Sequence, residues 1–121
     1  MDEISISAET FVAEATPTEV KEYVIQPEDF GMARASLDSL AVSSVEDSLA
    51  TIKAVLGKEP GPAADIVALN AGAAIYVAGL ADSIKEGVAL AQDAIGSGLA
   101  YAKLNELAQL SKVFQQENGC E

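Results

Sequence analysis

The first third of the chain alternates imperfectly between polar and apolar residues, as a strand pair does. Residues 10–15 and 20–25 are rich in β-branched and aromatic side chains, and the sequence Thr-Pro-Thr-Glu between them is typical of a turn. This pattern predicts a β-hairpin over about residues 8–26. Three of its charged side chains are predicted to lie on a solvent-exposed face: Glu14, Lys21 and Glu22.

From residue 43 onward, apolar residues recur at helical spacing. Ser43 and Glu46 have the spacing of a capping box, which predicts a helix that ends at Gly57. One face of this helix is predicted to be apolar and to carry Val45, Leu49, Ile52, Val55 and Leu56.

The next predicted helix, residues 62–80, is apolar almost all round and begins with Pro62, which suits a first helical turn. A helix without a polar face is expected to be buried on most sides. Small residues on it would let neighbouring backbones approach closely: Ala68, Gly72 and Gly79.

Two further helical segments follow. Ser83 and Glu86 form a second predicted capping box, and the helix after them places an apolar stripe on one face: Ile84, Val88, Ala91, Ile95 and Gly98. The sequence Gly-Ser-Gly at 96–98 should bend or weaken it, because glycine disfavours a helix interior by about 1 kcal/mol. A last helix is predicted over residues 99–115.

Composition narrows the class of protein. The 121 residues carry 19 acidic and seven basic side chains, a net charge of −12, which argues against binding to nucleic acid or to an anionic membrane surface. No apolar stretch reaches the ~20 residues of a membrane span. The chain has one cysteine, Cys120, interpreted as an inert thiol, and a reducing, cytoplasmic location is expected.

A hairpin with three or four helices gives an unbalanced fold. So short a chain offers few partners for the apolar helix at 62–80. The pattern therefore predicts an α/β fold that is a fragment, with part of its natural core lying outside residues 1–121.

Several segments, taken in order, resemble the C-terminal third of anthranilate phosphoribosyltransferases. They are the Asp-Glu-Ile-Ser that begins at Asp2, the stretch from Tyr23 to Gly31, the stretch from Gly61 to Ala74, and shorter matches at 76–79 and 102–104. The acidic pair alone is weak evidence, whereas the ordered series is specific and covers nearly the whole chain.

The resemblance implies a function. Enzymes of that family transfer the phosphoribosyl group of phosphoribosyl pyrophosphate to anthranilate and release pyrophosphate, in tryptophan biosynthesis. It implies that Asp2 and Glu3 correspond to an acidic pair that binds Mg²⁺ on the pyrophosphate. Mg²⁺ prefers oxygen ligands and is often held by one or two carboxylates with substrate phosphates. No catalytic side chain is predicted within this chain.

The departures from the family are equally informative. The glycine-rich phosphate loop, the anthranilate-binding residues and the helical domain of the family have no counterpart here. The resemblance therefore predicts that residues 1–121 are the C-terminal segment of the α/β domain. The isolated chain should be inactive, should need the missing N-terminal part of the same protein, and should form a homodimer when complete.

Other polar and aromatic residues have simpler interpretations. Asp29 is interpreted as a turn or cap residue, Asn70 as a buried amide with its hydrogen bonds satisfied, and Tyr76 and Tyr101 as packing residues. Without histidine, a hydrolase triad in its usual form is excluded. Two alternatives to the transferase remain. One is a non-catalytic interaction module that docks through the 62–80 helix, and the other is a nucleoside phosphorylase of related fold.

Overall fold

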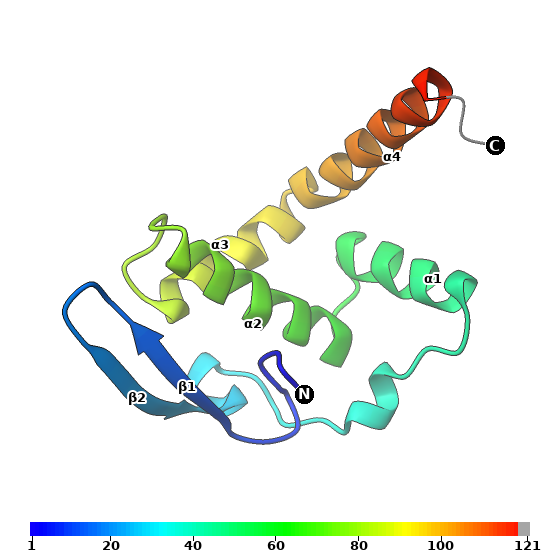
Figure 1. Ribbon diagram of the computed structural model, residues 1–121. Helices are drawn as coiled ribbons and strands as arrows, with labels where there is room; N and C mark the ends of the chain where they lie inside the picture. The colour runs from blue at the N-terminus through cyan, green and yellow to red at the C-terminus, as the bar shows by residue number, and fades with distance from the viewer. Residues whose placement is uncertain (119–121) are drawn as a thin grey trace.

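The computed structural model describes residues 1–118 as a two-stranded hairpin followed by four α-helices (Figure 1). Cys120, predicted to be an inert thiol, lies outside the described residues. The elements in chain order are β1 (Thr10–Ala15), β2 (Val20–Ile25), two short 3₁₀ helices (Pro27–Phe30 and Leu37–Leu40), α1 (Val45–Leu56), α2 (Pro62–Val77), α3 (Ile84–Gly96) and α4 (Leu99–Glu117).

The predicted hairpin is confirmed, strand for strand. β1 and β2 pair antiparallel, with Thr10 opposite Ile25 and Ala15 opposite Val20, and the Thr16 amide donates to the Glu19 carbonyl across the turn. Because side chains alternate along a strand, Thr10, Val12 and Glu14 share one face. Glu14 was predicted to face solvent, but its carboxylate lies on the half-buried face and meets two tyrosines.

Serine caps begin two of the α-helices. The prediction that Ser43 caps α1 is wrong by one residue, since Ser44 is the N-cap and its hydroxyl accepts from the Asp47 amide. Ser43 instead donates to the Asp47 carboxylate. The cap of α3 is as predicted, because the Ser83 hydroxyl accepts from the Glu86 amide.

Helices α2 and α3 form the centre of the fold and cross with their backbones in close approach. Gly72 of α2 faces Val88 of α3 so tightly that a Cβ on Gly72 would lie 2.5 Å from the Val88 amide nitrogen. Gly87 of α3 faces the Gly72 carbonyl oxygen in the same crossing. The predicted role of Gly72 is thus confirmed. Beside this crossing lies the core cluster: Ile6, Met32, Ala68, Leu69, Val88 and Ala91.

The apolar helix is shorter and less covered than its sequence predicts. α2 ends at Val77 rather than near residue 80, and Gly79 adopts a left-handed φ of 80° in the turn that follows instead of packing against another backbone. Val77 is 81% exposed. The apolar face predicted for α1 is likewise exposed to solvent at Val45, Leu49 and Ile52 and is buried only at Val55.

The chain exposes more surface than a compact protein of the same mass. Its accessible surface is 8172 Å², whereas a compact monomer of 12.5 kDa exposes roughly 6,200 Å² by the usual scaling of surface with mass. Much of α4 extends away from the other helices, as Figure 1 shows. Among residues 1–118, no helix is both long enough and apolar enough to cross a membrane.

Candidate functional site

The predicted acidic pair lies at the start of the chain, in an irregular segment that is hydrogen-bonded to α2 at Ile4. Asp2 and Glu3 are both exposed to solvent. In the part of the chain that the structure describes, no group of three or more His, Cys, Asp or Glu side chains comes together as a metal site. Any cation held here would therefore need oxygen ligands beyond these two carboxylates.

Asn70 of α2 binds this segment at Ile4, the residue that follows the acidic pair. The Ile4 amide donates to Asn70 Oδ1 at 2.9 Å, and Asn70 Nδ2 donates back to the Ile4 carbonyl oxygen at 3.0 Å. The same Nδ2 group donates to the Ile66 carbonyl one turn earlier in α2, at 2.9 Å. The interpretation of Asn70 as an amide with its hydrogen bonds satisfied is confirmed, although the side chain is half-buried rather than buried and two of its three bonds reach Ile4 instead of its own helix.

The residues after Ile4 are anchored as well. Ile6 is completely buried in the core cluster, and its carbonyl accepts from the Ala35 amide at 3.1 Å. The Ser5 amide donates to Thr10 Oγ1 at 3.1 Å, which joins the segment to the start of β1. The chain that leaves the acidic pair is therefore fixed at three successive residues.

A groove of about 410 Å³ opens between the hairpin and α2, with Asp2 at its edge. Its lining includes Ile4, Val12 and Ala73 as apolar wall, together with Glu14, Tyr23 and Tyr76 as polar groups. The hairpin supplies one wall and α2 the other. Asp2 thus lies beside a concave surface, which the sequence did not predict.

Within this groove the Glu14 carboxylate accepts two tyrosine hydroxyls. Tyr23 donates to Oε1 and Tyr76 donates to Oε2, each at 2.9 Å, so that β1, β2 and α2 meet at one side chain. Hydrogen bonds from Tyr23 and then Tyr76 lower the pKa of Glu14. Burial and the bond to Glu14 raise the pKa of Tyr23 to about 12, and the bond to Glu14 also raises the pKa of Tyr76.

We expect this Glu14–tyrosine cluster to stabilise the fold within a defined pH window. The lowered pKa of Glu14 gives a contribution that is present above its ordinary value of 4.5 and lost as the pH falls through the lowered value. The raised pKa of Tyr23 gives one that is present below 10.0 and lost as the pH rises towards about 12. A spectrophotometric titration of phenolate absorbance should find one tyrosine near 12.

Glu14→Gln is the matched variant for that titration. The amide keeps the shape and one acceptor but removes the charge, so the pKa of Tyr23 should move back towards 10.0. Tyr23→Phe should remove the transition near 12. Burial should keep part of the raised pKa in this variant, so a titration of Glu14→Gln that coincided with that of the unaltered chain would show that the charge of Glu14 contributes nothing to it.

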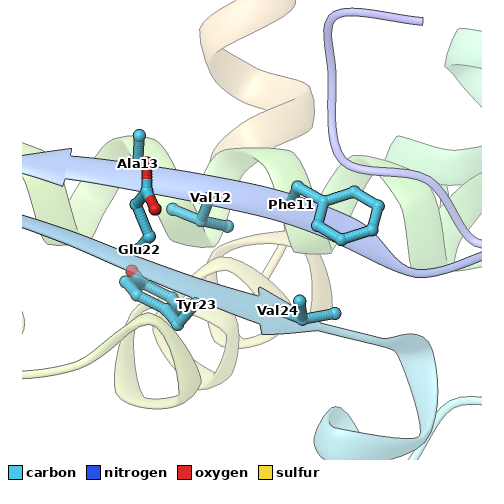
Figure 2. A pocket seen from close by; sticks show the side chains of 6 residues that line it. All are labelled: Phe11, Val12, Ala13, Glu22, Tyr23 and Val24. Atoms are coloured by element: carbon cyan, nitrogen blue, oxygen red, sulfur yellow. The ribbon is translucent and has the colours of Figure 1, made fainter.

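The opposite face of the hairpin is exposed and, apart from Glu22, apolar. Phe11 is 82% exposed and lies opposite Val24, as Figure 2 shows, while Ala15 lies opposite Val20 further along. Phe11, Val24, Ala13 and Glu22 belong to the lining of an open hollow of about 380 Å³. A strand pair with apolar residues on both faces is suited to the interior of a larger sheet assembly rather than to its surface.

The comparisons with known proteins give the class of protein. Residues 1–101 match the sequence profile described as glycosyl transferase family, a/b domain. The chain belongs to this family.

Particular relatives are more specific. The anthranilate phosphoribosyltransferase of Hahella chejuensis is 57% identical over 97% of this chain and 35% of its own length. That of Cellvibrio japonicus is 54% identical over 95% of this chain and 35% of its own length. The chain therefore spans about a third of the length of these relatives, and the resemblance predicted from the ordered segments is confirmed.

A solved structure supports the same relationship. The anthranilate phosphoribosyltransferase of Thermus thermophilus superposes with a TM-score of 0.79 at 40% identity, over 88% of this chain and 31% of that one. The Saccharomyces cerevisiae enzyme, in complex with 4-fluoroanthranilate, gives 0.73 at 25% identity, over 87% and 31%. The α/β fold class predicted from the sequence is confirmed.

Proposed function

We propose that this chain forms part of an anthranilate phosphoribosyltransferase and contributes the acidic corner of its metal site. The observation that carries the proposal is the 57% identity to the Hahella chejuensis enzyme across nearly all of the chain. In this proposal the whole protein transfers phosphoribosyl from phosphoribosyl pyrophosphate to anthranilate, as a step of tryptophan biosynthesis in the cytoplasm.

The acidic pair fits Mg²⁺ in its donor atoms. Asp2 and Glu3 offer exposed carboxylate oxygens beside a groove, and Mg²⁺ is commonly held by one or two carboxylates with waters and substrate phosphates. When bound, the ion would supply stabilisation of charge on the leaving pyrophosphate. In this proposal the residues of this chain bind and orient, and none of them is assigned as a nucleophile or a general base.

The rest of the protein is the proposed partner of this chain. The exposed apolar faces of the hairpin and of α1 are suited to packing against it, which would account for the excess surface of the described residues. The complete protein is proposed to be a homodimer. We therefore expect the 121 residues alone to give no turnover with phosphoribosyl pyrophosphate, anthranilate and Mg²⁺.

Reassembly tests the proposal directly. Adding the remaining two thirds of the Hahella chejuensis enzyme as a separate polypeptide should restore transfer, and Asp2→Ala with Glu3→Ala should then lower the rate roughly 100-fold or more. The control, Asp93→Ala with Glu117→Ala, changes the net charge equally at exposed helical positions and should leave the rate unchanged. Turnover by the isolated chain, or full activity of the Asp2/Glu3 double variant, would contradict the proposal.

The alternatives weighed from the sequence are tested by the same assay. A nucleoside phosphorylase would use inorganic phosphate as acceptor in place of anthranilate, and the identity to anthranilate enzymes favours the transferase. A non-catalytic docking module would bind the remaining portion without restoring transfer.

A further inference from the structure

We propose that Asn70 is a positioning residue for the acidic pair, acting as a clamp on the backbone at Ile4. This inference rests on the proposed function, because it assigns a purpose to the way in which Asp2 and Glu3 are held. It concerns the backbone that carries the carboxylates rather than contact with metal or substrate.

The clamp engages both polar groups of one residue. Asn70 Oδ1 accepts from the Ile4 amide and Asn70 Nδ2 donates to the Ile4 carbonyl, as a neighbouring β-strand would. The bond from Nδ2 to the Ile66 carbonyl fixes the orientation of the carboxamide itself. With three hydrogen bonds on one amide group, its position and its rotation about the side-chain axis are both determined.

The location of the clamp matters for the acidic pair. Consecutive Cα atoms are about 3.8 Å apart, so the Cα of Glu3 lies one peptide unit from the clamped residue and that of Asp2 lies two. Burial of Ile6 fixes the segment on one side of Ile4. On the other side, towards Asp2 and Glu3, the path of the backbone is set by the hydrogen bonds of Asn70 to Ile4. Loss of the clamp would remove the backbone hydrogen bonds that hold Ile4 to α2 and leave only the packing of its side chain against the core.

The stability of α2 does not explain why position 70 is an asparagine. Asparagine is a poorer helix former than leucine or alanine, and its neighbours in α2 are almost all apolar. A half-buried amide is costly without partners, and here its partners are mainly the backbone atoms of Ile4, 66 residues away in sequence. Asn70 thus stabilises the N-terminal segment rather than α2.

The first measurement is made on the chain by itself, by NMR. Asn70→Ala should speed hydrogen exchange at the Ile4 amide roughly tenfold or more, and it should lower the backbone ¹⁵N order parameters of Asp2 and Glu3. Hydrogen exchange of the amides in α3 should stay slow. Asn70→Ser guards against general unfolding, since serine can bond back to the Ile66 carbonyl but is too short to clamp Ile4. It should reproduce the local loss of order. Asn105→Ala, at an exposed position of α4, is the matched control and should change neither readout.

The second measurement uses the reassembled enzyme. Asn70→Ser should raise the half-saturating Mg²⁺ concentration by about 10-fold, as expected for loss of an outer support of a metal site, and should leave the KM for anthranilate unchanged. If Asp2 and Glu3 stay as ordered in both Asn70 variants as in the unaltered chain, or if the Mg²⁺ requirement is unmoved, the positioning role is overturned. Failure of the proposed function is distinct, because then Asp2→Ala with Glu3→Ala would leave the Mg²⁺ dependence unaltered.

Discussion

Gly87→Ala should destabilise the fold by about 3 kcal/mol or more, in a denaturant unfolding experiment. A Cβ at this position would meet the Gly72 carbonyl oxygen of α2, and backbone atoms yield less readily than the end of a side chain. Alanine stabilises a helix relative to glycine by only about 1 kcal/mol, so the steric clash outweighs this gain and the substitution is destabilising. Helices α2 and α3 would have to separate, which would also disturb the packing of Val88 and Leu69.

Gly96→Ala provides the matched control for this substitution. Gly96 is the last residue of the same helix, and a Cβ there would have no neighbour within 4 Å. The free energy of unfolding should be unchanged or should rise by up to about 1 kcal/mol. Equal effects of the two substitutions would show that the close crossing of α2 and α3 is not a determinant of stability.

The second large effect is expected at Leu69, which is completely buried in the core cluster. Leu69→Ala removes three carbons from the contact between α2 and the N-terminal segment and should lower the free energy of unfolding by about 2–5 kcal/mol. Because Ile6 and Met32 belong to the same cluster, the loss should also loosen the backbone that follows the acidic pair. Denaturant unfolding with parallel hydrogen exchange at residues 4–6 measures both effects.

Leu107→Ala makes the same chemical change at a position of α4 that is 59% exposed. Its effect should stay within about 0.5 kcal/mol, as is usual for surface substitutions. A loss comparable to that of Leu69→Ala would mean that the α4 surface is covered in solution, which the described arrangement does not include.

Local features were readable from the sequence because each depends on neighbours in the chain. The hairpin strands, the Pro62 helix start and the Ser83 cap follow from turn chemistry, fixed backbone angles and side chains that bond a backbone amide three residues ahead. The error at Ser43 has the same origin, because two adjacent serines offer equivalent caps and the choice of Ser44 depends on how the chain enters α1.

The relation between distant residues was not readable in this way. Gly72 could be identified as a close-approach residue, but its partner Gly87 could not, since a glycine within a helical pattern gives no indication of what it faces. Glu14 was predicted to face water on polarity alone, yet Tyr23 and Tyr76 bring their hydroxyls to it from another strand and from α2.

The sequence by itself determined the hairpin, the helices, the absence of histidine chemistry and the resemblance that singles out Asp2 and Glu3. The tertiary structure decided how that pair is held, because the hydrogen bonds of Asn70 to Ile4 join residues 66 positions apart. It also decided which apolar residues are covered, since burial depends on which elements pack together and not on hydrophobicity alone. Helices α2 and α3 could approach closely enough to build that core because both carry glycine where they cross.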